Sequence, residues 1–391
     1  MAYLTHYAEL YGANRSLLDL VVRAREAHGI EPFVILSEEG PLCEALQAQG
    51  IDRAIVPFVP WMHKQMLMGG PHHRIMQRFG YWRQGRERDA WNATRMKELV
   101  RVCSAKAVDL VHINSSVIGM GVPLAKALGV PLVWHIRELP FAHYDFKVDG
   151  GLSRYRSELR QADALIAISD AVRRDVEAIM AQSTRIHVVH NGVVNTLRME
   201  QLGATMHERW SDPSPFTFLQ LGLFHPSKGQ LDSVEAFAQV HREEPDTRLV
   251  LAGGGRQDEV RARVKELGLS DVIDLPGFVQ DPFIPLADAH CLLQCSKDEA
   301  MGRATVEAMA SGIPVIGHAS GATPELIEEG RSGHLYIRID ELVQRMLERV
   351  RDIGSTKSMG CAAHARVQDD FTVEAMTGSV VEVYDRLAVR S

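Results

Sequence analysis

Two carboxylates, Glu299 and Glu307, flank the start of a short predicted helix in the second half of the chain. Gly302 lies in the loop between them, and residues 304–310 have the composition of a helix. The N–H groups and dipole at a helix amino terminus bind anions such as a diphosphate. Carboxylates accept hydrogen bonds from the hydroxyls of a sugar or a ribose. The stretch therefore predicts a site for a ligand with phosphates and hydroxyls, the alternative being a solvated charged loop.

The elements that must position these groups alternate along the first 190 residues. Several apolar runs, such as Ala-Leu-Ile-Ala-Ile at 164–168, are apolar on both faces, as buried parallel strands are. Strand alternating with helix is typical of a doubly wound α/β domain. The predicted strands cover residues 2–6, 32–37, 54–58, 109–114, 131–135, 164–169 and 186–190, and the clearest helical patterns cover 16–28 and 90–105.

The alternation starts again after a polar stretch at about 195–215. The second set of predicted strands covers residues 216–221, 248–252, 272–275, 290–294, 314–317 and 334–337, with helices at 230–243 and 256–267. Two successive Rossmann-like domains are therefore predicted, 1–195 and 196–372, facing a central cleft. Ligands of such sheets bind at the carboxyl ends of the strands. Residues 373–391 contain a predicted amphipathic helix.

Composition excludes several classes of function. A formal net charge of −7 argues against a nucleic-acid partner, which would require a basic face. The amino terminus lacks the pattern of a signal peptide, and no apolar run approaches the roughly 20 residues that span a bilayer. Five scattered cysteines have no zinc-site spacing, which favours free thiols in a reducing cytoplasm.

Residues 296–317 read SKDEAMGRATVEAMASGIPVIG and closely resemble the signature of the family 4 retaining glycosyltransferases (glycosyl transferases group 1). That family has the GT-B fold, and its pattern is Glu-Gly-Phe-Gly followed by Glu-Ala-Met-Ala-x-Gly-x-Pro-Val-Ile. The resemblance also implies that the C-terminal helix, here in residues 373–391, crosses back to the N-terminal domain. The chain keeps both glutamates, Gly302, the Glu-Ala-Met-Ala block and Pro-Val-Ile at 314–316. It departs at Ala300 and Met301, where the family usually has glycine and an aromatic residue.

The resemblance implies roles for individual residues. Glu307 would bind the ribose hydroxyls and Glu299 the sugar hydroxyls at the reacting end. Lys228, in the loop GLFHPSKG at 222–229, would bring a cation to the leaving diphosphate. The remaining positions implied for the donor are Gly222, Gly254, Phe278 and Val279 near the nucleotide, and the backbone of Ala300, Met301, Gly302 and Arg303 around the sugar and phosphates.

Position 223 is the most consequential departure from the family pattern. The family has arginine there, whereas this chain has Leu223. One of two cations expected at the diphosphate is therefore missing. Arg303 or His225 could substitute for it, and a catalytically impaired relative stays open.

The amino-terminal half resembles the family more weakly. Residues 8–16 connect the first strand to a helix that Asn14 or Ser16 could cap. Gly12 lies where the family has a glycine-rich loop facing the donor phosphates. His135, at the carboxyl end of a strand, matches a histidine that lies beside the donor sugar. Arg137 and Glu138 could pair with each other or meet the acceptor.

Residues 61–88 combine six Lys/Arg and one acidic residue with interleaved aromatic side chains, among them Trp61, Phe79 and Trp82. In an acidic chain such a segment could contact an anionic membrane surface or a lipid-linked acceptor. The alternative is a loop and helix whose aromatic side chains pack on the domain.

The sequence as a whole predicts a metal-independent hexosyl- or N-acetylhexosaminyl-transferase that uses a UDP- or GDP-linked sugar and no other cofactor. The acceptor would be a hydroxyl on a saccharide, a lipid-linked or a small molecule, in cell-surface polysaccharide or glycolipid assembly. The expected location is the cytoplasm, including a peripheral position on the inner face of the membrane. Three alternatives are open: a non-catalytic nucleotide-sugar-binding or scaffold relative, a nucleotide-sugar 2-epimerase, and a phosphorylase with pyridoxal phosphate.

Overall fold

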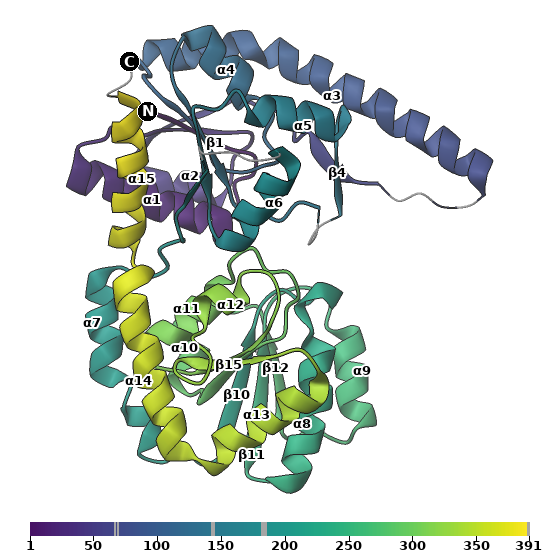
Figure 1. The fold of residues 1–391 in the computed structure, drawn as a ribbon, viewed down its shortest axis with the longest axis vertical. Helices are drawn as coiled ribbons and strands as arrows, with labels where there is room; N and C mark the ends of the chain where they lie inside the picture. Colours follow the sequence, from purple (N-terminus) through teal and green to yellow (C-terminus); the bar gives the residue numbers. More distant parts are fainter. Residues whose placement is uncertain (66–67, 69, 142–144, 181–185, 389–391) are drawn as a thin grey trace. The chain divides into compact units, whose positions relative to one another are not determined.

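The computed structural model describes residues 1–391 except 66–67, 69, 142–144, 181–185 and 389–391 (Figure 1). The chain divides into two compact units. Unit 1 contains Met1–His190 together with the chain from Met376 onward, and unit 2 contains Asn191–Ala375. The last helix, α15 (Val373–Ala388), begins in unit 2 and continues as part of unit 1.

Unit 1 is built on a seven-stranded parallel sheet of order β3-β2-β1-β5-β6-β8-β9. Its central strands are buried on both faces, which explains their uninterrupted apolar sequences. The order of the strands reverses between β1 and β5, so this is the topological switch point of the sheet. The strands are β1 (Ala2–Thr5), β2 (Phe33–Leu36), β3 (Asp52–Ile55), β5 (Val111–Ile113), β6 (Leu132–Ile136), β8 (Ala164–Ala167) and β9 (Ile186–Val188).

The helices of unit 1 cover its sheet, and α15 contributes to its core. Met376, Val380 and Tyr384 of α15 pack with residues of α1, β1 and β2. A short antiparallel pair, β4 (Met62–Lys64) with β7 (Phe146–Val148), stands apart from the main sheet. The other helices are α1 (Gly12–His28), α2 (Pro41–Ala48), α3 (Pro71–Ala105), α4 (Gly121–Leu128), α5 (Gly151–Leu159) and α6 (Asp170–Met180).

Unit 2 is built on a six-stranded parallel sheet of order β12-β11-β10-β13-β14-β15, with its switch point between β10 and β13. Its strands are β10 (Phe216–Leu221), β11 (Thr247–Ala252), β12 (Ile273–Gly277), β13 (Cys291–Gln294), β14 (Val315–His318) and β15 (Gly333–Tyr336). Its helices are α7 (Thr196–Thr205), α8 (Gln230–Glu243), α9 (Asp258–Glu266), α10 (Phe283–Ala287), α11 (Arg303–Ala310), α12 (Thr323–Leu326), α13 (Ile339–Arg351) and α14 (Ile353–Asp370), with the 3₁₀ turns Glu208–Trp210 and Pro226–Lys228.

The two doubly wound domains predicted from the sequence are thus present, with three local differences. The strand predicted at 54–58 is observed at Asp52–Ile55. The helix predicted at 90–105 is the second half of α3, which begins at Pro71. The strands β4 and β7 were not predicted, because three residues are too few to establish a period of two.

The five cysteines are all free thiols, and four of them are buried. Burial raises the pKa of the Cys291 thiol to about 12. None of the helices that the structure describes combines the length and the apolar character needed to cross a bilayer.

Candidate functional site

The loops on either side of the switch point of unit 2 bring Lys228 and Glu299 together. Lys228 ends the turn that follows β10, and Glu299 lies in the loop that follows β13. The ammonium of Lys228 donates a hydrogen bond to Oε1 of Glu299. Their side chains are only 22% and 13% exposed, so the pair is partly shielded from water. Two residues 71 positions apart in sequence therefore form one charged centre where α/β sheets bind ligands.

Buried amide side chains hold the loop that carries Lys228. Nε2 of Gln220, at the end of β10, donates to the carbonyl of Lys228 (2.6 Å), and Ser233 donates to the Oε1 of the same amide (2.6 Å). Nε2 of Gln230 donates to the carbonyl of Leu223 (3.0 Å). These positioning residues were missed from the sequence, although a glutamine inside an otherwise apolar strand is a signal that could have found Gln220.

The loop that follows β14 holds the backbone around Glu299 in place. The hydroxyl of Ser320 accepts the N–H of Asp298 (2.9 Å), and Ala322 N–H donates to the carbonyl of Glu299 (2.8 Å). A Cβ on Gly321 would lie 2.4 Å from the Glu299 carbonyl oxygen, so the close approach requires glycine. Asp298 itself has φ of 55°, a strained conformation of the kind found at functional sites.

Helix α11 starts at the end of this loop. Gly302 immediately precedes the helix and has φ of 86°, a backbone conformation that only glycine adopts without strain. Met301 is buried, and its sulfur accepts the N–H of Asn191 (3.2 Å). Nε of Arg303 lies 3.7 Å from Oε1 of Glu307 one turn later, and Glu307 is only 6% exposed. Arg303 and Glu307 therefore lie side by side on the first turns of α11.

The glycines predicted near the nucleotide bring neighbouring loops into contact. A Cβ on Gly253 would lie 1.8 Å from the carbonyl oxygen of Gly222, so the loops after β10 and β11 touch through backbone alone. A Cβ on Gly254 would meet Phe278 at ordinary contact distance. Phe278 is 69% exposed, and Val279 beside it is half-buried. These three loops lie at the carboxyl ends of the adjacent strands β10, β11 and β12, and Lys228 belongs to the loop after β10.

Leu223 is 57% exposed, so the departure from the family pattern places an apolar side chain in solvent at this site. His225, considered as a substitute cation, has a structural role. Its Nδ1 accepts the N–H of Ser227 (3.2 Å) and so caps the turn that carries Lys228. Arg303 stays the stronger candidate for the second cation because it lies at the amino terminus of α11.

In unit 1, Gly12 is the first residue of α1 and is exposed. The expectation that Asn14 or Ser16 caps this helix is wrong, because the cap position is Tyr11 and no side chain bonds to it. Asn14 instead holds the preceding loop. Its amide donates to the carbonyls of Tyr7 (2.9 Å) and Glu9 (2.8 Å), and it is itself wholly buried.

The predicted polar residues at the end of β6 form a buried cluster at the switch point of unit 1. Nε of Arg137 donates to Oδ1 of Asn114 at 2.6 Å, and its NH2 lies 3.3 Å from Nδ1 of His135. The imidazole of His135 is 0% exposed and packs edge-on against His112. An imidazole that lines a sugar requires an exposed edge, which His135 does not have in this structure.

Burial sets the protonation of these histidines. Removal from water and, as a smaller contribution, the positive charge of Arg137 together lower the pKa of His112 to about 3. The pKa of His135 is held well below its ordinary value by burial first and by Arg137 second. Nδ1 of His112 bonds to the hydroxyl of Tyr384 at 2.7 Å. Both imidazoles are therefore neutral at pH 7.

Arg137 and Glu138 have different hydrogen-bond partners. The carboxylate of Glu138 accepts two hydrogen bonds from Ser116, one from its hydroxyl (2.8 Å) and one from its backbone N–H (3.0 Å). His6, at the end of β1, was missed from the sequence; burial lowers its pKa, while the charge of Glu138 opposes that shift. His6 and Glu138 are thus the half-buried titratable pair at this edge of unit 1.

No grouping of three or more histidine, cysteine or carboxylate side chains that could hold a metal ion occurs within the part of the chain that the structure describes. The groups assembled in unit 2 are instead one ammonium, one guanidinium, two carboxylates and the start of a helix. Such a set binds phosphates and hydroxyls directly.

Comparison with known protein families finds two matching models. Residues 206–363 match the family described as glycosyl transferases group 1. Residues 11–195 match the family described as glycosyltransferase family 4. The two models together cover most of both units.

Two curated relatives are about a quarter identical to this chain over the regions that align. An N-acetyl-alpha-D-glucosaminyl L-malate synthase of Bacillus anthracis is 24% identical over 59% of this chain and 61% of its own length. An alpha-maltose-1-phosphate synthase of Mycolicibacterium smegmatis is 26% identical over 74% of this chain and 82% of its own length. The matched region is thus less than two thirds of the Bacillus enzyme.

Among solved structures, the chain is similar to Anabaena Alr3699/HepE in complex with UDP, with a TM-score of 0.78. The sequences are 20% identical, and the alignment covers 99% of each chain. This likeness confirms the GT-B fold class that the sequence predicts.

Proposed function

Because the chain belongs to the group 1 glycosyltransferases of family 4, we propose that it transfers a sugar from a nucleoside-diphosphate sugar to an acceptor hydroxyl with retention of the anomeric configuration. The donor is a UDP- or GDP-linked hexose or N-acetylhexosamine, and UDP is the first to test because the similar Anabaena protein was solved with UDP. No metal ion takes part.

One observation carries this proposal: Lys228 and Glu299 meet at the switch point of unit 2, at the loop that leads into α11. Their positions in the loop match the family motif, and the surrounding backbone is held by Gln220, Ser320 and Gly321. A charged pair that is positioned in this way offers an ammonium to a diphosphate and a carboxylate to a sugar hydroxyl.

The reaction proposed is a same-face substitution. The bond between the anomeric carbon and the diphosphate oxygen breaks, and the acceptor oxygen forms its bond to that carbon on the same face. The proton of the acceptor hydroxyl passes to the departing diphosphate. Lys228, Arg303 and the N–H groups at the start of α11 stabilise the charge that develops on the diphosphate. Detection of a stable glycosyl ester on Glu299 by mass spectrometry would contradict this route.

The remaining residues are assigned by their place in the loops. Glu299 accepts a hydrogen bond from a hydroxyl of the donor sugar, and Glu307 accepts hydrogen bonds from the ribose hydroxyls. Phe278, exposed beside Gly254, flanks the base. In unit 1 we assign His135 a positioning role, because it contacts Arg137 and is itself buried. Arg137 and Glu138 are assigned to the acceptor.

The acceptor is a hydroxyl on a saccharide, a lipid-linked or a small molecule, and the process is assembly of cell-surface polysaccharide or glycolipid. We place the reaction in the cytoplasm, with the enzyme in a peripheral position at the inner face of the membrane. Incubation of purified protein with each nucleotide sugar and candidate acceptors, followed by mass spectrometry, tests this assignment.

A thermal-shift panel with UDP, GDP, ADP, CMP and NAD, with and without EDTA, tests the donor site. A ligand at a hundred times its dissociation constant adds about 2.7 kcal/mol of stability, which raises Tm by roughly 5–11 °C for a domain of this size. A shift with one nucleoside diphosphate that EDTA does not change supports the proposal. A shift that depends on metal removes the metal-independent mechanism.

One observation favours a second candidate, a non-catalytic nucleotide-sugar-binding relative. Leu223 is exposed where the family has an arginine, so the site lacks one expected cation. Such a protein would bind a nucleoside diphosphate weakly and turn over no donor. Absence of transfer and of donor hydrolysis, with binding intact, would favour this candidate. Product formation without acceptor would instead indicate a 2-epimerase.

A further inference from the structure

The first half of α3 exposes apolar side chains along one side. Ile75 is 63% exposed, Phe79 59% and Trp82 57%. Their spacing of four and three residues places them on the same helix face. The rings of Phe79 and Trp82 stack, with centroids 5.6 Å apart. These three side chains, the apolar stripe, expose apolar area on one helix face, and exposed apolar area of this kind marks interaction sites.

Arginines border the apolar stripe. Residues 71–86 contain Arg74, Arg78, Arg83 and Arg86 and no aspartate or glutamate, although the net charge of the chain is −7. The guanidinium of Arg86 lies 5.8 Å from the ring centroid of Trp82, on the same face of the helix. This half of α3 therefore joins exposed apolar area to positive charge.

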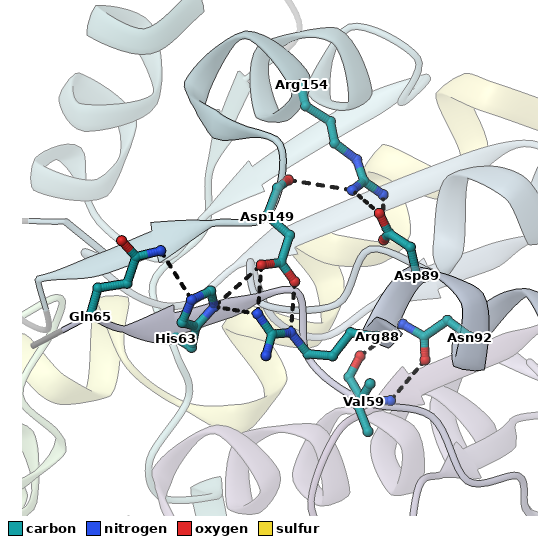
Figure 2. A network of polar contacts seen from close by, with 8 residues as sticks. All are labelled: Val59, His63, Gln65, Arg88, Asp89, Asn92, Asp149 and Arg154. Atoms are coloured by element: carbon teal, nitrogen blue, oxygen red, sulfur yellow. Dashed lines mark hydrogen bonds and ion pairs between the residues drawn. The ribbon is translucent and has the colours of Figure 1, made fainter. Parts of the chain in front are cut away.

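The second half of α3 is fixed to unit 1 by an ionic network (Figure 2). Arg88 donates two hydrogen bonds to the carboxylate of Asp149, at 2.8 and 2.7 Å, and NH2 of Arg88 lies 3.1 Å from Nδ1 of His63. Asp149 is 6% exposed. The hydrogen bonds that Arg88 donates to Asp149 raise the pKa of Arg88. A Cβ on Gly85 would lie 2.8 Å from the Asp149 carboxylate, so the helix packs here without a side chain.

Two further contacts complete this attachment. Both terminal nitrogens of Arg154 donate to Asp89, at 2.8 and 3.0 Å. The amide of Asn92 exchanges two hydrogen bonds of 3.0 Å with the backbone of Val59. The structure describes every residue of α3, and Gly85 is the first of them that is buried. The helix from Gly85 onward is thus held, while its amino-terminal end extends away from the rest of unit 1 (Figure 1).

The two alternatives for residues 61–88, packing on the domain and contact with a membrane, therefore apply to different parts of the segment. Trp61 is 1% exposed and packs against Trp134 and Tyr155 in the core, as the packing alternative predicts. Phe79 and Trp82 do not pack in this way. Residues 66, 67 and 69 of this segment lie outside the described residues.

We propose that residues 71–86 of α3 dock on a bilayer that contains anionic phospholipid. The apolar stripe enters the boundary between headgroups and acyl chains, and the arginines contact lipid phosphates. A second copy of this chain is a poorer occupant, because pairing of this face with itself would bring together two sets of arginines without acidic partners. Because the ionic network at Asp149 fixes α3 to the rest of unit 1, docking of residues 71–86 also orients unit 1 on the bilayer.

The test is flotation of the full-length protein with vesicles of phosphatidylcholine and phosphatidylglycerol and with vesicles of phosphatidylcholine alone. The wild type binds the mixed vesicles more tightly, and salt weakens this binding. The double variant Phe79→Ser/Trp82→Ser loses at least about 10-fold in vesicle affinity, because two apolar side chains leave the interface. The double variant Arg83→Gln/Arg86→Gln loses about 25-fold on anionic vesicles alone.

Matched controls lie on the same helix. Trp91→Ser removes an exposed tryptophan whose ring is covered by Arg95, and Lys97→Gln/Arg101→Gln removes two exposed charges. Neither control changes vesicle affinity if the proposal holds. Equal losses in Trp91→Ser and Phe79→Ser/Trp82→Ser would overturn it, as would wild-type protein that ignores the anionic lipid. Light scattering that shows a dimer dispersed by Phe79→Ser/Trp82→Ser, without vesicle binding, would assign the stripe to a second copy instead.

Quenching by brominated phosphatidylglycerol measures insertion separately from surface charge. The wild type loses fluorescence on these vesicles, and Trp82→Phe abolishes most of that loss. Quenching that persists in Trp82→Phe would overturn insertion of the apolar stripe. These measurements contain no nucleotide sugar, so their failure is distinguishable from failure of the proposed transferase activity, which the nucleotide panel tests on the same variants.

Discussion

Lys228 and Glu299 meet on surface loops beside the switch point of unit 2, whereas Arg137 and His135, at the switch point of unit 1, are buried. Lys228, Glu299 and Arg137 lie in loops that follow parallel strands, whereas His135 lies within β6. Buried amides support both pairs, Gln220 in one unit and Asn114 in the other. The difference lies in solvent access. A partly exposed ion pair can exchange its partner for a ligand, while a buried cluster stabilises the unit that contains it.

This comparison predicts different consequences of mutation in the two units. Changes to Lys228 or Glu299 should alter chemistry and leave folding nearly intact, because partly exposed pairs contribute little to stability. Changes to the buried cluster of unit 1 should alter the stability of the fold and its response to pH.

The largest expected effect is that of Lys228→Ala on turnover. Removal of one positioned donor to a developing charge costs about 2.7–4 kcal/mol, or roughly 100- to 1000-fold in kcat. Steady-state kinetics measures this loss, and the melting temperature should stay near that of the wild type. Lys265→Ala, which removes an exposed lysine on α9, is the matched control. A loss confined to KM would instead assign Lys228 to ground-state binding.

Glu307→Gln should weaken nucleotide binding by about 10- to 100-fold, because a hydrogen bond to a charged group contributes roughly 1.5–3 kcal/mol. Glutamine keeps the shape of a side chain that is 6% exposed beside Arg303. Calorimetric titration with the nucleoside diphosphate that binds wild-type protein measures the change. Glu259→Gln, an exposed position on α9, provides the comparison. Equal affinity in wild type and Glu307→Gln would remove the ribose assignment.

His112→Gln should flatten the dependence of unfolding free energy on pH. The folded-state pKa of about 3 is below the unfolded value, so the unfolded chain binds the proton first. Stability from this group is therefore complete above pH 6.5 and falls as pH decreases toward 3, by about 1.4 kcal/mol per pH unit for one histidine. Urea unfolding at several pH values measures the slope. His28→Gln, an exposed histidine, should leave the slope unchanged.

The smallest effect expected is a gain. Leu223→Arg places a guanidinium where the family has one, and affinity for the nucleoside diphosphate should rise by up to about 10-fold for an exposed charge. The change should cost no stability, because Leu223 is 57% exposed. Titration at low and high salt measures the gain. No gain at low salt would show that Arg303 already supplies the second cation.

Much of the fold follows from local pattern. The strand Phe216–Leu221 and the helix Gln230–Glu243 have the bounds that the sequence predicts, because their apolar residues follow clear periods. The first half of α3 was not predicted, although Ile75, Phe79 and Trp82 keep a helical spacing. Gly80 and the arginines among these apolar residues weaken the pattern of a packed helix, and the apolar face is exposed in the structure.

The candidate site divides in the same way. The residue types and spacing at 299–307 identify two carboxylates, a glycine and the start of a helix, because these features are local to one segment. The pairing of Lys228 with Glu299, the support from Ser320 and Gly321, and the burial of His135 are decided by which strands are neighbours. The sequence alone thus determined the chemistry that is available and the two doubly wound sheets. Only the tertiary structure decided which groups meet and which stay in contact with water, because contacts between distant residues depend on strand order and packing.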